Sequence, residues 1–286
     1  WKKGWEYWEL SLGCKYRKEW VYGDEKRWDG TKGQCVVVYG EQGLGDEINY
    51  ASVIPDAIAD CKKVIVDCDP KLEKLFRRSF PRASVYGTRR DASPHWLADA
   101  RIDARCAISS LPGFYRHSDG DFPGTPYLKA DPELVKMWRG LFAEWGKPVY
   151  GLCLHGGSKF TGASWRKIEP EDFSPILGKD AVFISLDYKG HVKNTRIKEY
   201  TWATQADDYD LTAGLIAALD AVIGVNTTAI HCANGLGIPT HILVPTKKQW
   251  RYEPCSDGSY AWSKTAKLYQ QAEGESWRDV IKRVVL

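Results

Sequence analysis

The sequence predicts an α/β protein made of two doubly wound, parallel-sheet domains. The chain has 286 residues, which is longer than a single hydrophobic core usually grows. Apolar, β-branched runs alternate with helical stretches through both halves, a pattern typical of a parallel sheet covered on both faces. In each half the first clear apolar run leads directly into a glycine-rich loop. These observations predict two Rossmann-like domains of the same general plan.

The composition is that of a globular protein. Hydrophobic residues make up 43% and charged residues 27%, which excludes a disordered chain. The net charge of +3 gives no general indication of nucleic-acid binding. No C-x-x-C pair suggests a zinc or redox site, so we interpret the eight cysteines as reduced, buried thiols. With no signal peptide and no long apolar run, we expect a cytoplasmic location and no membrane insertion.

Changes in the pattern divide the chain into four segments. The first is rich in aromatic and charged residues without a clean period, so we expect an arm rather than a domain. An amphipathic helix with Pro132 in its first turn, ended by Gly146 and Pro148, separates the two halves. The segments are an N-terminal arm (1–30), the first Rossmann-like domain (31–128), an interdomain helix and linker (129–147), and the second Rossmann-like domain with a C-terminal helix (148–286).

Ligands of doubly wound sheets bind beyond the carboxyl ends of the strands, so the loops there are the places to look for a site. If the two domains face each other, several such loops surround one cleft. The expected strands are the apolar runs 35–39, 64–66 and 84–86 in the first domain, and 149–154, 181–186, 221–225 and 241–244 in the second.

The first glycine loop leads into Asp46 at the start of a helix. Gly43, Leu44 and Gly45 precede it, and the spacing G-x-x-G-x-G matches neither the dinucleotide fingerprint nor a P-loop. A carboxylate at this helix start would repel a phosphate. Asp46 is better suited to act as a general base that takes the proton of an acceptor hydroxyl. The alternative is a helix cap.

A second candidate loop follows the run 221–225. Asn226, Thr227 and Thr228 stand where a helix begins, and the free N–H groups and dipole of a helix N-terminus suit a diphosphate. His231 falls on the first turn of that helix. It either gives a further hydrogen bond to the phosphate or packs inside the domain.

The third loop combines glycine with cations. Gly157 and Ser158 form the turn, and Lys159 and Arg166 follow as groups able to neutralise a departing nucleoside diphosphate. The alternative is that both cations are solvated surface charges.

Two further features are weaker. Asp67-Cys68-Asp69 imitates a metal-binding D-x-D sequence, but it ends a strand and precedes Pro70, so we interpret it as strand end and cap and expect no metal. Leu186 and Asp187 are candidates for a nucleotide pocket, and Trp250 either lines that pocket or closes the domain.

Together these loops resemble those of glycosyltransferase family nine, the lipopolysaccharide heptosyltransferases, and especially the related domain that follows tetratricopeptide repeats in bacterial proteins. The specific parts are the string 41–48 and the block 217–239. The resemblance implies a GT-B fold and an inverting, metal-independent transfer from a nucleoside-diphosphate sugar, without a cofactor. It also implies an upstream tetratricopeptide-repeat segment in a longer parent chain. The acceptor hydroxyl, on a glycan, a protein or a modified nucleic acid, stays open.

Carried over by position, the resemblance gives Asp46 the role of general base on the acceptor side. Thr227, Thr228 and His231 match the diphosphate-binding helix start, and the cations at 159 and 166 lie where the family has phosphate contacts. This chain departs from the family at Asn226, where the family usually has Asp, and in the loop after His155. Two other classes of function are weighed against transfer: a non-catalytic nucleotide-sugar-binding or interaction module, and a GT-B sugar-nucleotide epimerase.

Overall fold

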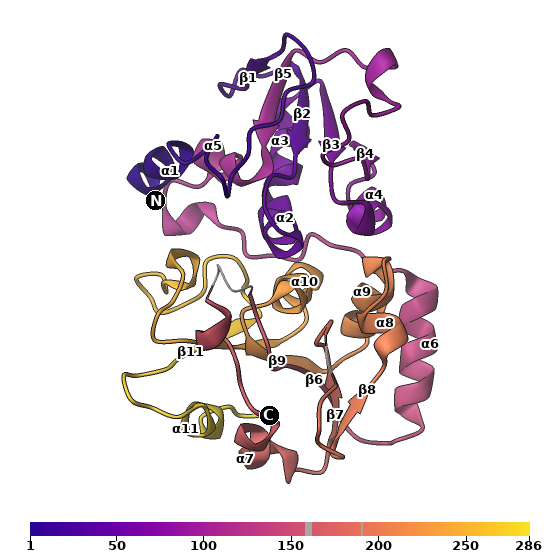
Figure 1. The fold of residues 1–286 in the computed structure, drawn as a ribbon, viewed down its shortest axis with the longest axis vertical. Coiled ribbons are helices and arrows are strands. Elements are labelled where there is room, and N and C mark those ends of the chain that lie inside the picture. The colour runs from indigo at the N-terminus through magenta and orange to yellow at the C-terminus, as the bar shows by residue number, and fades with distance from the viewer. Residues whose placement is uncertain (158–161, 190) are drawn as a thin grey trace. The chain divides into compact units, whose positions relative to one another are not determined.

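The computed structural model describes residues 1–157, 162–189 and 191–286, and it divides into two compact units. Unit 1 comprises Trp1–Pro123 and Tyr127–Lys129, and unit 2 comprises Gly124–Pro126 and Ala130–Leu286. Each unit is built on one parallel sheet with helices packed against it (Figure 1). The expectation of two doubly wound α/β domains is confirmed.

Unit 1 has five strands in the order β1-β5-β2-β3-β4, and every pair is parallel. Every residue of β2 is buried, as expected for a strand covered on both faces. The strands are β1 (Lys26–Arg27), β2 (Cys35–Tyr39), β3 (Lys63–Asp67), β4 (Ser84–Tyr86) and β5 (Ala104–Ala107). The helices are α1 (Lys2–Glu9), α2 (Leu44–Tyr50), α3 (Ile54–Asp60), α4 (Glu73–Ser79) and α5 (Pro112–Tyr115).

The N-terminal residues, expected as an arm, are an integral part of unit 1. Trp5 is buried and its indole N–H donates to the carbonyl of Arg116 at 2.6 Å. The Trp8 indole donates in the same way to the carbonyl of Ser109 at 3.1 Å. Figure 1 shows α1 beside α5, and the two helices are in contact. The aromatic residues therefore have a packing role, because their rings fill the unit while their N–H groups find acceptors.

Unit 2 has six parallel strands in the order β11-β10-β9-β6-β7-β8. The strands are β6 (Val149–Cys153), β7 (Val182–Ser185), β8 (Ile197–Glu199), β9 (Ala221–Val225), β10 (Thr240–Val244) and β11 (Ala266–Gln270). The helices are α6 (Pro132–Ala143), α7 (Ser174–Leu177), α8 (Thr201–Thr204), α9 (Tyr209–Ala217), α10 (Thr228–Leu236) and α11 (Trp277–Lys282).

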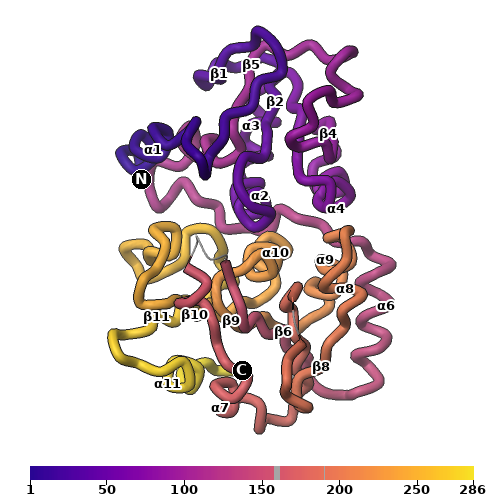
Figure 2. Tube along the Cα trace, viewed as in Figure 1, coloured from indigo at the N-terminus to yellow at the C-terminus, as the bar shows by residue number. Residues whose placement is uncertain are grey.

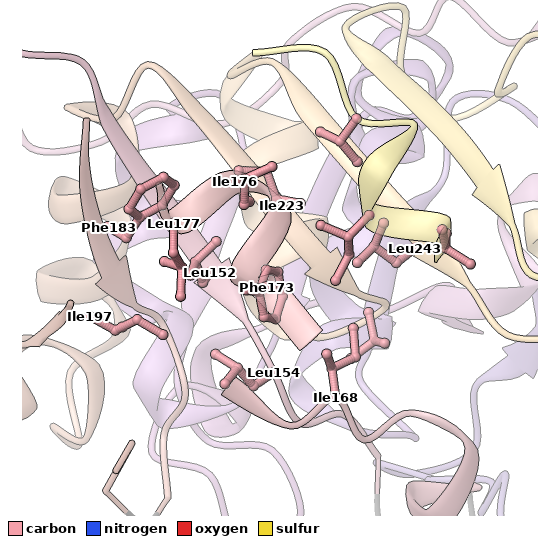
Figure 3. Close-up of a cluster of buried hydrophobic side chains, with 14 residues drawn as sticks. Leu152, Leu154, Ile168, Phe173, Ile176, Leu177, Phe183, Ile197, Ile223 and Leu243 are labelled. Atoms are coloured by element: carbon pink, nitrogen blue, oxygen red, sulfur yellow. The ribbon is translucent and has the colours of Figure 1, made fainter. Parts of the chain in front are cut away.

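One large hydrophobic cluster fixes the unit 2 sheet. Figure 3 shows Leu152, Ile223 and Leu243, from three neighbouring strands, in the same cluster as Phe173 and Ile176. All five side chains are at most 2% exposed. Burial on this scale holds the strands in register and so fixes where their carboxyl ends lie.

The helix α6, expected within an interdomain linker, belongs to unit 2. It packs against α9, and its Trp138 ring stacks on Trp202 with the ring centroids 5.0 Å apart. Asp131 caps the helix by accepting the N–H of Glu133 at 2.8 Å. Figure 2 shows α6 running along the outside of the unit, next to α8.

Within the described part of the chain, every helix is too short or too polar to cross a lipid bilayer. Five of the eight cysteines are buried, as the sequence indicates, but Cys14 is exposed and Cys61 and Cys255 are half-buried.

Candidate functional site

The strand order of unit 2 locates a ligand-binding position. From β6 the chain proceeds outward through β7 and β8, and it then returns to the other side of β6 to build β9, β10 and β11. The direction of winding therefore reverses between β6 and β9, which are parallel neighbours. Doubly wound sheets bind ligands outside the carboxyl ends of the strands at such a switch point. The loops there begin at His155 and Asn226.

Two glycines allow these loops to lie against each other. A Cβ atom on Gly156 would come within 2.8 Å of the Asn226 carbonyl oxygen. Gly157 has φ +79°, and a Cβ atom there would lie 1.9 Å from Nη2 of Arg166. Only glycine fits both positions without displacing a neighbour.

Arg166 lies directly behind this glycine turn. Its side chain is buried, and Nη1 donates to the carbonyl of Asn226 at 3.1 Å. Arg166 is therefore not a solvated surface charge. Its buried positive charge lies at the switch point and contributes to the electrostatic potential of the site. Ser158 and Lys159, which the sequence adds to this loop, lie outside the described residues.

The start of α10 has the expected geometry. Thr227 is the N-cap, and its Oγ1 accepts the N–H of Ile230 at 3.4 Å. Thr228 is the first helical residue, and both threonines are half-buried. The first N–H groups of a helix have no acceptor within it, so they are available to a ligand oxygen.

Two neighbours of this helix start are deeply buried. His231 is 5% exposed, and its Nε2 is hydrogen-bonded to the Tyr252 hydroxyl at 3.1 Å, which matches the packed alternative. Asn226 is 3% exposed, its Nδ2 donates to Gln249 at 3.4 Å, and its Oδ1 has no hydrogen-bond partner among the described residues. An orphaned buried acceptor beside a helix start is a position where a ligand or water donor fits.

The three residues expected near a nucleotide pocket lie in different surroundings. Leu186 is buried, whereas Trp250 is 42% exposed on the short 3-10 helix η8 (Trp250–Tyr252). Asp187 is buried and accepts a hydrogen bond from Nδ1 of His155 at 2.7 Å. The sequence identifies His155 only as the beginning of the glycine loop, although its position directly after a strand run is a signal for a site residue.

In unit 1 the winding reverses between β2 and β5, and the loop after β2 leads to Asp46. Asp46 is the third residue of α2, and its Oδ2 accepts the N–H of Gly43 at 3.2 Å, which makes it part of a capping box. It is half-buried, as are Leu44 and Gly45, whereas Gly43 is exposed. A capping bond to one oxygen and a catalytic role for the carboxylate are compatible.

Two buried acids beside Asp46 were missed. Glu41 accepts hydrogen bonds from Arg17 and Ser109. Glu47 is fully buried, pairs with Arg89 and accepts the N–H of Asp69 at 2.9 Å. Burial raises the pKa of Glu47 to about 8, although Arg89 lowers it. No local signal identifies these acids, because their partners come from distant parts of the chain.

The D-x-D sequence is structural in the way the residues indicate. Asp67 ends β3 and accepts hydrogen bonds from the Tyr22 hydroxyl at 2.6 Å and the Thr88 hydroxyl at 2.8 Å. Asp69 caps the 3-10 helix η2 (Pro70–Leu72) by accepting the N–H of Lys71 at 3.0 Å. Across the described residues, no three His, Cys, Asp or Glu side chains are grouped to hold a metal ion. Metal independence stays a prediction.

Two doubly wound units, each with a parallel sheet, a glycine loop and a reversal of winding, define the GT-B class of fold. Solved structures of glycosyltransferases share it. A glycosyl transferase family 9 structure from Veillonella parvula has a TM-score of 0.56 at 12% identity, over 91% of this chain and 97% of that one. The ADP-heptose LPS heptosyltransferase II of E. coli has a TM-score of 0.50 at 14% identity, over 87% and 94%. The fold is thus that of the family which the sequence resembles.

Among curated proteins, Protein FlbA of Caulobacter vibrioides is 26% identical over 284 residues. The match covers 90% of this chain but 47% of the relative, so the chain spans about half the length of the curated relative it matches. No protein-family model matches the chain.

Proposed function

We propose that this chain is an inverting, metal-independent glycosyltransferase that moves a sugar from a nucleoside-diphosphate sugar to an acceptor hydroxyl. The observation that carries the proposal is the start of α10 beside buried Arg166 at the switch point of unit 2. Helix N–H groups and a guanidinium are the groups that proteins use to bind phosphate. The shared fold with a family 9 structure and with an ADP-heptose enzyme supports the same class of reaction.

The residues divide into two roles. Thr227 and Thr228 at the helix start, with Arg166 and Lys159, bind the diphosphate and stabilise its charge as it leaves. Asp46 takes the proton of the acceptor hydroxyl while that oxygen attacks the anomeric carbon. The new carbon–oxygen bond forms as the bond to the phosphate oxygen breaks on the opposite side, which inverts the configuration.

Nucleotide binding is the first test. ADP, UDP, GDP and CMP are each added to the protein, and the unfolding midpoint is followed by differential scanning fluorimetry. A ligand that binds only the folded state stabilises it by about 2.7 kcal/mol at one hundred times its Kd, so at least one nucleoside diphosphate should raise the midpoint. If none does, while the protein is shown to be folded, the donor site assigned to unit 2 is wrong.

Product analysis then separates transfer from the alternatives. The sugar nucleotide that matches the bound nucleotide is incubated with the protein and followed by mass spectrometry and NMR. A transferase releases free nucleotide slowly to water and faster with an acceptor. An epimerised but intact sugar nucleotide, or an unchanged one under all conditions, contradicts the proposal. The cytoplasmic location and the upstream tetratricopeptide-repeat segment stay predictions.

A further inference from the structure

His155 and Asp187 form a pair at the carboxyl edge of the unit 2 sheet. His155 follows β6 and Asp187 follows β7, and these two strands are parallel neighbours. Nδ1 of the imidazole lies 2.7 Å from Oδ2 of the carboxyl. The pair joins two loops at the edge where ligands of doubly wound sheets bind.

Asp187 is fixed in place by the backbone. Its Oδ1 accepts the N–H of Leu154 at 3.1 Å and the N–H of His155 at 3.3 Å. Burial raises the pKa of this carboxyl, and the hydrogen bonds from His155 and the backbone oppose that shift. Because Asp187 accepts from Nδ1, the orientation of the imidazole is set and Nε2 is the nitrogen that remains for a ligand.

Nε2 belongs to a side chain that solvent reaches. The His155 side chain is 46% exposed, and no hydrogen bond to its Nε2 is found within residues 1–157, 162–189 and 191–286. The next residue, Gly156, lies against the start of α10, since a Cβ atom there would come within 3.2 Å of Cγ2 of Thr227. His155 is therefore the sequence neighbour of a glycine that contacts the helix start on which the proposed function rests.

We propose that His155, protonated and oriented by Asp187, donates a hydrogen bond from Nε2 to a phosphate oxygen of the bound nucleotide. The proposal rests on the proposed function. As the bond between the sugar carbon and the phosphate oxygen breaks, its electron pair stays on that oxygen, and the imidazolium stabilises the added charge. His155 is then a catalytic residue, and Asp187 is its positioning residue.

Nucleotide affinity should therefore depend on pH. An imidazole that donates from Nδ1 to Asp187 carries a second proton on Nε2 only as the imidazolium, so the His155 contribution should weaken as the pH rises. The charged groups around His155 in the described residues are Asp187, Arg166, and the pair of Lys167 and Glu169, whose side chains are 2.6 Å apart. A terminal phosphate becomes more negative as the pH rises through about 6, which should strengthen nucleotide binding over the same range. Variants of His155 are therefore needed to separate its contribution from that of the phosphate.

The experiment measures Kd by isothermal titration calorimetry from pH 5.5 to 8.5, using ADP, UDP, GDP and CMP as probes. The variants are His155→Gln, which keeps an amide donor without the charge, and Asp187→Asn, which removes the partner's charge. Lys167→Gln is the matched control, because it removes a neighbouring exposed cation and leaves the His155 pair intact. The bare nucleosides serve as ligands that lack phosphate.

At the lowest pH, His155→Gln should weaken nucleotide binding about tenfold, and the difference from the unaltered protein should shrink as the pH rises. Asp187→Asn should shift this pH dependence of nucleotide binding to lower pH, whereas Lys167→Gln should leave it unchanged. Nucleoside binding should be unaffected throughout. A ratio of His155→Gln to unaltered Kd that is constant with pH would overturn this inference and leave the proposed function standing. Failure of every probe to bind the unaltered protein would overturn the proposed function itself.

Discussion

The carboxyl edges of the two sheets share a plan but differ in what fills them. In unit 1 the position between β2 and β5 holds a buried ion pair of the protein itself, since Arg17 from the N-terminal segment contacts Glu41 there. In unit 2 the equivalent position between β6 and β9 has two glycines, a helix start and one buried guanidinium. At the carboxyl edge of the unit 1 sheet, buried charged side chains pair with each other. At the carboxyl edge of the unit 2 sheet, a helix N-terminus and a guanidinium are hydrogen-bond donors suited to an anion.

The difference shows that a glycine loop after a first strand does not by itself define a phosphate site. The loop after β2 leads to acids, and Glu47 lies so close over Gly40 that a Cβ atom there would meet its carboxylate at 2.2 Å. The loop after β6 instead uses its glycines to approach Arg166 and the Asn226 carbonyl. What packs behind the glycine decides which charge the edge presents.

The largest effect should come from the acid of unit 1. Asp46→Asn keeps an oxygen able to accept the Gly43 N–H, so the fold should survive. Removal of the base should slow release of nucleotide from the donor by about 10² to 10⁴-fold. The rate is measured by coupled assay under saturating donor, with Asp56→Asn, on α3 of the same unit, as control. Near-normal turnover in folded Asp46→Asn would remove the base assignment.

The next largest effect should come from the buried ion pair of Arg89 and Glu47 in unit 1. Arg89→Met leaves the fully buried Glu47 without its guanidinium and should cost about 3 to 5 kcal/mol of unfolding free energy at pH 8. The folded-state pKa of Glu47, already raised to about 8, should rise further. Between the ordinary pKa of a glutamate and that raised value, the folded state binds more protons than the unfolded state, so stability falls as pH rises.

Urea unfolding at several pH values measures this loss. Arg77→Met is the matched control, because Arg77 pairs with Glu73 on an exposed helix face and should contribute only about 0.5 kcal/mol. Equal losses for the two arginines, or a loss for Arg89→Met that grows as pH falls, would show that Glu47 is not the group involved.

A smaller effect should follow from the glycine turn of unit 2. Gly157→Ala forces Arg166 to move and should weaken binding of a nucleoside diphosphate about tenfold. Gly258→Ala is the control, because Gly258 has a similar φ of +81° but open space where the Cβ atom would be. Both variants should lose about 1 kcal/mol of stability through backbone strain, and Gly157→Ala alone should lose affinity. A parallel loss of affinity in both would assign the effect to strain.

The smallest effect is expected at the helix cap. Thr227→Ala should cost about 1 kcal/mol of stability, as should Ser276→Ala, which removes the N-cap of α11. Thermal unfolding and calorimetry on both variants separate the two contributions of Thr227. Weaker nucleotide binding should appear only in Thr227→Ala, and its absence would mean that Thr227 serves the helix alone.

The elements that the sequence predicts well are those with a continuous apolar run. β2, β6 and β9 are buried along almost their whole length and appear where expected. β5 was missed because Arg105 interrupts it. The charge is tolerated because the Arg105 guanidinium pairs with Glu19 at 2.9 Å and with Glu25 at 3.6 Å. β11 was missed because its residues are mostly half-exposed and have no clear apolar pattern.

The residues of the candidate site also differ in how well the sequence predicts them. Local rules find Asp46 and Thr227, because capping residues and helix starts are encoded by adjacent positions. They do not find the burial of Arg166 or the pairing of His155 with Asp187, which depend on which strands become neighbours. Long-range pairing is set by sheet order, and one sequence alone does not specify it.

The most direct test of the division between the two edges is nucleotide binding by one variant from each. Calorimetry gives the Kd of the nucleoside diphosphate identified in the panel for Asp46→Asn and Arg166→Met, each confirmed as folded by circular dichroism. The Kd should be unchanged for Asp46→Asn and raised about tenfold or more for Arg166→Met. Weaker binding in Asp46→Asn with unchanged binding in Arg166→Met would contradict this division.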